Sequence, residues 1–314
     1  MVGARRQKFI GAHRAIQRRR CACDVSAKDL VKKTTTLRMK NNIIVALIIV
    51  LLLGGGYALY RQRFIVSQTV QSLTIPKAVE YDLVVAPVVN DQDQPVESDK
   101  GLDETETPQD LQTGTIDPTE PVPPPQSINL AIPFTSQAPQ TDWGLPYQEA
   151  CEEASVLMAA AFLNAEVDLS TPVLAEQEIL SFVALEETQL GAYLDTTVEE
   201  TIRVANARFP SLVFTSVNNP TIDEIKTLLA NGVPVIVPAA GRKLQNPFYS
   251  GVGPLYHMLV LRGYTSTSFI TNDPGTRRGE QYLYTFDTIM EAMGDWNGGN
   301  PAQGAKMIIV VHKR

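Results

Sequence analysis

The segment DQDQPVESDKGLDETETPQDLQTGTIDPTEPVPPPQ, residues 91–126, most limits what this chain of 314 residues can fold into. Acidic residues, proline and threonine dominate the segment, and large apolar side chains are nearly absent from it. A segment of this composition cannot bury a hydrophobic core, and its PVPPP end favours an extended, stiff backbone. The sequence therefore predicts a disordered spacer, followed by a folded domain that begins near Ile128.

Charge is segregated along the chain. Residues 1–40 carry 12 Lys and Arg against 2 Asp and Glu, whereas residues 128–314 carry 11 basic and 20 acidic residues. A domain with this acidic balance lacks the basic surface that binding to nucleic acid requires. We therefore expect no nucleic-acid partner for the domain, and the basic arm needs a separate explanation.

The segment NNIIVALIIVLLLGGGYALY, residues 41–60, contains no charged residue and is followed by Arg61 and Arg63. A helix rises about 1.5 Å per residue, so this length is just sufficient to cross a hydrocarbon core of about 30 Å. The excess of basic residues before it holds that flank in the cytoplasm. The sequence predicts a single transmembrane anchor, with all residues after Arg63 outside the cytoplasmic membrane.

A cleaved signal peptide is the alternative, with residues 43–53 as its apolar core and Gly56-Tyr57-Ala58 as a small-x-small site. The long apolar run and the poor cleavage site favour the uncleaved anchor, and both interpretations export the domain. Met39 followed by Lys40 also resembles the start of an export signal, in which case residues 1–38 would precede the true start.

The chain thus divides into a basic arm (1–40), an anchor (41–60), a tether with the acidic linker (61–127) and a domain (128–314). Within the domain, helical patterns cover residues 151–164, 172–187 and 196–208, and Thr221 opens a capping box before a short helix that stops at Gly232. Runs of β-formers follow: VPVIVPAA, YHMLVLRGY, SFITND, QYLYTF and KMIIVVHKR. Helices first and strands afterwards predict an α+β domain with a mostly antiparallel sheet.

Cys151 is the one cysteine outside the basic arm, and it opens the first helical segment of the domain. A helix N-terminus carries about half a positive charge and stabilises a thiolate, although Glu152 and Glu153 oppose this locally. Oxidising compartments select against idle thiols, so an exported single cysteine is notable. Cys151 is therefore a candidate nucleophile, with an inert core residue as the alternative.

A cysteine nucleophile needs a base, and the chain has three histidines. His13 lies in the basic arm, across the predicted membrane from Cys151, and His312 is predicted at the exposed end of a final strand. His257 remains. It opens the strand HMLVL, where a purely structural histidine is the alternative interpretation.

The strands HMLVLRGY and SFITND are separated by TST, which predicts an antiparallel hairpin. This hairpin would bring His257 within two or three residues of the position opposite Asn272 and Asp273. A carboxylate beside an imidazole fixes its tautomer. Only one of Asn272 and Asp273 can serve, because neighbouring residues of a strand point to opposite faces. Asp273 also suits a plain turn before Pro274.

An oxyanion donor is the remaining requirement, and Gln137, Gln140 and Gln148 precede the cysteine. Gln148 belongs to the start of the helix, whereas Gln137 and Gln140 lie in a separate loop. An amide N–H₂ from that loop and the backbone N–H of Cys151 would together bind a developing oxyanion. The residues alone do not choose between Gln137 and Gln140.

The blocks IPFTSQAP, PYQEACEEASVLM, GVPVIVPAAGRKL, GPLYHMLVLRGY and FITNDPGTRRG together resemble the family thirty-nine group of cysteine peptidases. These are papain-like enzymes related to the bacteriocin-processing peptidases that cut after double-glycine leaders. The resemblance spans about residues 130–312. It implies a papain-like cysteine peptidase fold, in which a helical N-terminal half packs on the mostly antiparallel sheet.

The resemblance further implies Cys151 as nucleophile, His257 as general base and then acid, Asp273 as the group that orients the imidazole, and Gln137 as oxyanion donor. It implies no metal or organic cofactor. Glu152 departs from the bacteriocin-processing members, which usually have a small residue there. Those members are also commonly the cytoplasmic part of a transporter, so we do not expect a double-glycine substrate here.

The main hypothesis is a membrane-anchored, externally facing cysteine peptidase that acts on a peptide or protein substrate. The same residues suit a cell-wall amidase or a transglutaminase-like acyl transfer, because a fold does not fix the substrate. A non-catalytic binding module on a tether is the third possibility.

Overall fold

The computed structural model describes residues 45, 49–50, 54–55, 75–84 and 124–314. The chain forms two compact units, Met1–Thr69 and Val70–Arg314, and the described residues of the first unit are helical. Within these described ranges, no helix combines the length and hydropathy needed to span a membrane. The predicted basic arm lies outside the described residues, and so do most of the predicted anchor and most of the acidic spacer.

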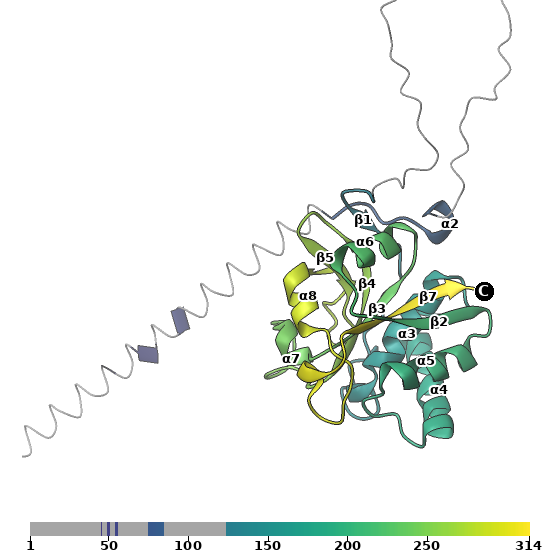
Figure 1. Cartoon of the computed structure of the whole chain (residues 1–314). Coiled ribbons are helices and arrows are strands. Elements are labelled where there is room, and N and C mark those ends of the chain that lie inside the picture. The colour runs from purple at the N-terminus through teal and green to yellow at the C-terminus, as the bar shows by residue number, and fades with distance from the viewer. Residues whose placement is uncertain (1–44, 46–48, 51–53, 56–74, 85–123) are drawn as a thin grey trace, which may run out of the picture. The chain divides into compact units, whose positions relative to one another are not determined.

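The second unit is built on a seven-stranded sheet in which all neighbouring strands are antiparallel (Figure 1). The strand order is β2-β7-β3-β4-β5-β6, and β1 pairs with β4. This confirms the predicted mostly antiparallel sheet. The strands are β1 (Ile128–Asn129), β2 (Leu212–Asn218), β3 (Val235–Ala239), β4 (His257–Tyr264), β5 (Ser268–Asn272), β6 (Tyr282–Thr285) and β7 (Met307–Lys313).

Helices pack around this sheet. Helix α3 packs on β3 and β4 and also contacts α4, while α5 packs on β2 and β7, and α8 on β5 and β6. The elements are α2 (Tyr81–Val84), η1 (Tyr147–Glu149), α3 (Cys151–Phe162), α4 (Pro172–Leu190), α5 (Val198–Arg208), α6 (Ile222–Ala230), α7 (Gly241–Leu244), α8 (Phe286–Ala292) and η2 (Pro301–Gln303). The four predicted helices are confirmed, with ends that differ by two or three residues.

Helix α3 is buried along nearly its whole length, with Ala161 as the one residue that is not fully buried. Small alanines surround Leu157 and Met158, so α3 packs as a core helix, although Glu152, Glu153 and Ser155 are buried with it. Its first residue, Cys151, is consequently held in the interior of the domain.

The capping signals act as predicted. Thr221 accepts the backbone N–H of Glu224, and the Glu224 side chain accepts the backbone N–H of Thr221 at the start of α6. The same reciprocal pair links Thr197 and Glu200 at the start of α5. Each cap satisfies backbone donors that have no partner inside the helix.

Residues 75–84, which the sequence assigned to the tether, pack on the domain. Val79 forms a parallel bridge with Leu130, and the Asn129 side chain donates a hydrogen bond to the Pro76 carbonyl at 3.0 Å. The ring of Tyr81 contacts Phe162 edge-on, with 5.7 Å between the ring centroids. This part of the tether is therefore integral to the folded unit.

The predicted hairpin is confirmed as β4 and β5, with Val260 opposite Asn272. Its register shifts between Leu261 and Gly263. At Gly263 the backbone of β1 comes so close that an added Cβ would lie 2.1 Å from the Ile128 carbonyl oxygen. Only glycine fits this position. The hairpin places His257 at the start of one strand and Asp273 just beyond the end of the other.

Candidate active site

Cys151 occupies the first position of α3, and its side chain is 6% exposed. Its Sγ atom accepts the backbone N–H of Met258 at 3.3 Å and donates to Glu152 Oε2 at 2.9 Å. Met258 directly follows His257 in β4. The start of the buried helix therefore meets the start of the histidine strand, as the nucleophile hypothesis requires.

His257 and Asp273 form a buried pair, with Nε2 of the imidazole 2.8 Å from Oδ1 of the carboxylate. The side chains are 1% and 0% exposed. Engagement of Nε2 leaves Nδ1 as the ring nitrogen for proton exchange. A Cβ added at Gly275 would lie 2.9 Å from His257 Cε1, so this glycine makes room for the ring.

Asp273 accepts hydrogen bonds on both carboxylate oxygens. Oδ1 also accepts the Gly275 N–H at 3.0 Å. Oδ2 accepts the side chains of Asn246 at 2.9 Å, Tyr249 at 2.8 Å and Tyr284 at 2.6 Å. Burial raises the pKa of Asp273, but the charge of His257 and these donors outweigh burial, so the pKa lies below its ordinary value. The group is a stable carboxylate that orients His257.

The side chain of Asn272 does not contact His257 and has other partners. Its Oδ1 accepts a hydrogen bond from Arg262 Nη1 at 3.1 Å, and its Nδ2 donates to the carbonyls of Ile132 and Pro133. The structure thus assigns the contact with His257 to Asp273, a choice that the sequence left open. The alternation of neighbouring strand residues between the two faces explains why only one of them reaches the ring.

Gln137 links its own loop by hydrogen bonds to the turn at Pro274 and to η1. Its backbone N–H donates to the Pro274 carbonyl at 3.0 Å, and its Nε2 donates to the carbonyls of Tyr147 at 2.9 Å and Gln148 at 2.8 Å. Both amide N–H groups are therefore occupied in this conformation. Gln137 anchors its loop to the start of α3, and it can bind an oxyanion only after its amide leaves these carbonyls.

The two other glutamines lie at the surface. Gln140 Nε2 donates to Glu176 Oε2, and Gln148 Nε2 donates to Glu149 Oε1 at 2.9 Å. Neither side chain bonds to the η1 carbonyls that hold the Gln137 amide. The backbone N–H groups in the first turn of α3 remain as donors without intrahelical partners.

The thiol lies in an acidic environment. Burial is the largest cause that raises the pKa of Cys151, followed by the charge and hydrogen bond of Glu152, while the Met258 N–H opposes them. The pKa of Glu152 is raised as well, first by burial and then by the charge of Glu153. Burial and the contact with Glu152 thus favour the thiol of Cys151 over the thiolate in this conformation.

A second pair of carboxyls lies one residue further along α3. Glu153 and Glu186 are both 0% exposed, and within residues 124–314 no residue outside this pair donates a hydrogen bond to their side-chain oxygens. Burial, followed by the charge of Glu186, raises the pKa of Glu153, and burial raises the pKa of Glu186 to about 8. Burial therefore favours the protonated forms of both carboxyls.

Sequence reasoning missed Asn246, Tyr249 and Tyr284, which complete the hydrogen bonds to Asp273. The stretch NPFYSG before the histidine strand reads as an ordinary loop, and Tyr284 reads as an ordinary strand aromatic. No spacing signal connects these positions, because they meet only through the fold.

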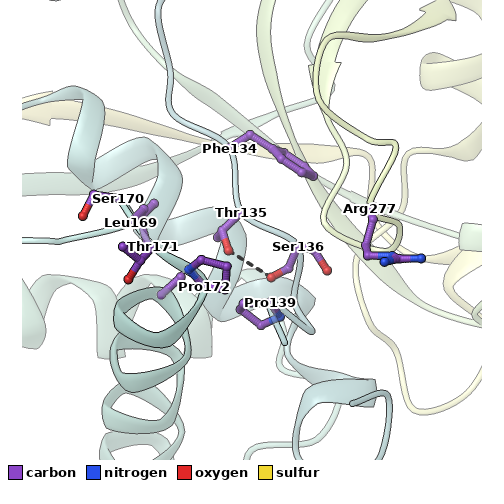
Figure 2. A pocket seen from close by; sticks show the side chains of 10 residues that line it. Phe134, Thr135, Ser136, Pro139, Leu169, Ser170, Thr171, Pro172 and Arg277 are labelled. Atoms are coloured by element: carbon purple, nitrogen blue, oxygen red, sulfur yellow. Dashed lines mark hydrogen bonds between the residues drawn. The ribbon is translucent and has the colours of Figure 1, made fainter. Parts of the chain in front are cut away.

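A cavity of about 200 Å³ lies between the loop that contains Phe134 and Pro139, the start of α4, and Arg277 (Figure 2). None of Cys151, His257 and Asp273 lines it. Ser136, which does, directly precedes Gln137, and Arg277 follows Asp273 by four residues. Within the described part of the chain, no cluster of three or more His, Cys, Asp and Glu residues has the geometry of a metal site.

The Peptidase_C39 like family model matches residues 129–299 of this chain. A crystal structure described as a C39-like peptidase from Bacillus anthracis covers 60% of this chain and 99% of its own, with 15% sequence identity and a TM-score of 0.42. No curated protein matches the chain.

Proposed function

The chain belongs to the Peptidase_C39 like family, and we propose that it is a cysteine peptidase that hydrolyses peptide bonds through a thiol acyl-enzyme. One observation carries this proposal: the buried pair of His257 and Asp273 lies beside the start of the helix that holds Cys151. The carboxylate thereby orients the imidazole, and the thiol is hydrogen-bonded to the next residue of the histidine strand, which is the arrangement that this chemistry needs.

In the proposed reaction, the Cys151 thiol gives its proton to Nδ1 of His257 while sulfur bonds to the carbonyl carbon of the substrate. Asp273 accepts the Nε2–H of the ring and stabilises the resulting imidazolium. The imidazolium then protonates the leaving amine as the peptide C–N bond breaks. Water, deprotonated by His257, attacks the thioester and releases the acid product and the thiol.

The developing oxyanion needs donors. The backbone N–H of Cys151 in the first turn of α3 is one of them, because it has no partner inside the helix. We assign Gln137 as the second, provided that substrate draws its amide away from the carbonyls of Tyr147 and Gln148. Until then Gln137 holds the loop and the helix start in place.

The proposal includes a membrane-anchored enzyme whose domain faces outward. The uncharged segment 41–60 and the basic excess before it support this location. The acidic linker would then set the reach of the domain from the membrane surface.

The test incubates the full chain with a mixture of synthetic peptides and identifies new peptide ends by mass spectrometry. We expect cleavage by the native chain, none by Cys151→Ala, and a loss of about 10²- to 10⁴-fold in His257→Ala, the range for removal of an acid–base group. Ser155→Ala is the matched control, since Ser155 lies on α3, is buried and makes no hydrogen bond through its hydroxyl.

Release of peptidoglycan fragments without peptide cleavage would replace the peptidase with a cell-wall amidase. Equal cleavage by the native chain and Cys151→Ala would overturn the proposed nucleophile. Absence of turnover on both kinds of substrate, with Cys151 inert to alkylation, would favour a binding module.

A further inference from the structure

Glu152 touches the proposed nucleophile, and the proposed reaction gives it no part. Its side chain is 2% exposed, and its Oε2 lies 2.9 Å from Cys151 Sγ. Two buried anions at this separation repel strongly, because little solvent screens them. The carboxylate and the thiolate therefore exclude one another, and the contact decides which atom carries the negative charge.

The carboxyl of Glu152 is held in place from outside its own helix. Its Oε1 accepts the backbone N–H of Thr196 at 3.1 Å. Thr196 is itself fixed, because its carbonyl accepts the Tyr256 hydroxyl at 3.1 Å and its Oγ1 pairs with Thr201 Oγ1 at 2.9 Å. On the other side, the Met258 N–H holds the sulfur. Glu152 cannot turn away from the thiol without losing the Thr196 contact.

The charged groups that act on this pair from the surrounding elements are carboxyls. Glu153 acts from α3, Asp195 from the loop before α5, and Glu186 from α4. Tyr256, just before β4, faces Glu152 and Cys151 with a neutral hydroxyl. His257 is the next residue after Tyr256, and it becomes a cation in the proposed reaction. No lysine or arginine is among the groups that shift the pKa of Cys151 or of Glu152.

We propose that Glu152 keeps Cys151 as a neutral thiol in the resting site, so that the thiolate–imidazolium pair with His257 forms only when the charge of Glu152 is neutralised or displaced. This inference rests on the proposed function, because it assigns the resting state of the same nucleophile. Glu152 acts as a positioning residue: the S–H group donates to its carboxylate, and the proton stays on sulfur.

The test measures the rate of alkylation of Cys151 by iodoacetamide against pH in the full chain. The peptide that contains Cys151 is quantified by mass spectrometry, so that Cys21 and Cys23 do not contribute. Glu152→Gln is the main variant. Its Oε1 still accepts the Thr196 N–H, and its Nε2 presents a hydrogen-bond donor to the sulfur in place of a negative charge.

We expect the native chain to react only as pH approaches or exceeds about 8.5, the ordinary thiol pKa, because the thiolate is the reactive species. Glu152→Gln should react about tenfold or more faster at pH 7, since a fall of one unit in pKa raises the thiolate fraction about tenfold. Glu152→Asp retains the charge and should stay slow. Glu153→Gln changes the neighbouring buried carboxyl, which acts on the thiol less than Glu152 does, so it should change the rate less than Glu152→Gln does.

His257→Ala separates this inference from the proposed function. If native alkylation is already fast below pH 8 and slows in His257→Ala, while Glu152→Gln has no effect, the inference about Glu152 is wrong and the peptidase proposal stands. If Glu152→Gln accelerates alkylation and adding His257→Ala does not slow it, Glu152 acts as inferred but the thiolate has no imidazole partner. That outcome would remove the proposed dyad.

Circular dichroism and thermal unfolding establish which variants fold. Glu152→Ala removes both the charge and the contact, and it replaces Glu152→Gln if the latter does not fold. A folded variant that lacks the carboxylate and still reacts at the native rate overturns the inference.

Discussion

Asp273 and the pair Glu153–Glu186 are carboxyl groups buried in the same domain, and they differ in what surrounds them. Asp273 receives hydrogen bonds from His257, Gly275, Asn246, Tyr249 and Tyr284. Glu153 and Glu186 receive none from any residue outside the pair within residues 124–314. The pKa of Asp273 is lowered although burial opposes this, while burial raises the pKa of both glutamates.

The difference shows that burial alone does not decide whether a carboxyl is charged. Desolvation penalises every buried anion, and preorganised donors together with a cation can more than compensate for it. Asp273 has both and can serve as an orienting carboxylate. The glutamate pair lacks such a set of donors, and burial favours its protonated forms. Glu152 lies between these cases, because its side chain accepts hydrogen bonds from the Thr196 N–H and from the Cys151 thiol.

Replacement of Asp273 by Asn should have the largest effect on activity. The amide cannot stabilise the imidazolium and permits the wrong tautomer, so we expect kcat/KM for a cleaved peptide to fall by about 10³- to 10⁴-fold. Urea unfolding at pH 7 should show whether the fold survives. A decrease of less than about tenfold in a folded variant would mean that Asp273 does not orient the base.

Replacement of Glu186 by Gln should change how stability depends on pH. The pKa of Glu186 is about 8 in the folded state, above its ordinary value of 4.5, so the folded protein binds more protons between these pH values. The free energy of unfolding therefore falls as pH rises from about 4.5 to 8. Glu186→Gln removes this loss and should stabilise the protein by about 2 kcal/mol at pH 9, the scale for replacing a poorly compensated buried charge.

Urea unfolding of both proteins at pH 5, 7 and 9 measures this effect. Glu187→Gln is the control, because Glu187 is the next residue of α4 and is exposed. Parallel pH profiles for the native chain and Glu186→Gln would show that the buried pair does not titrate in this range.

Much of the fold follows from local patterns. The helices, the antiparallel sheet and the β4–β5 hairpin are predictable because periodicity, Thr221 and Gly232 act over a few residues. The exact pairing across the hairpin is not, because the register shift between Leu261 and Gly263 depends on the approach of β1. That shift helps to determine where Asp273 lies relative to His257.

The candidate site was predictable in its residue types and not in its contacts. Elimination among three histidines and one domain cysteine leads to His257 and Cys151, which the fold brings together through Met258. The contact between Glu152 and the thiol has no sequence signal, because a charged residue beside a helix start is ordinarily solvated. The occupied amide of Gln137 likewise depends on the path of the loop around η1.

Replacement of Tyr284 by Phe should have the smallest effect of these substitutions, because it removes a single hydrogen-bond donor to Asp273. It removes the 2.6 Å hydrogen bond to Asp273 Oδ2 and leaves the other donors in place. We expect a loss of about 1–2 kcal/mol in the free energy of unfolding at pH 7, typical of a hydrogen bond to a charged group, and less than about tenfold in kcat/KM.

The acid side of the stability profile distinguishes this effect from a packing defect. The folded pKa of Asp273 lies below its ordinary value, so its stabilisation is present above that value and is lost as pH falls through the folded pKa. In Tyr284→Phe this loss should begin at a higher pH, because the folded pKa rises when a donor is removed. Tyr193→Phe, at a half-buried tyrosine, is the control. A uniform loss of stability at all pH values would show that Tyr284 contributes only packing, and that the remaining donors suffice to keep Asp273 charged.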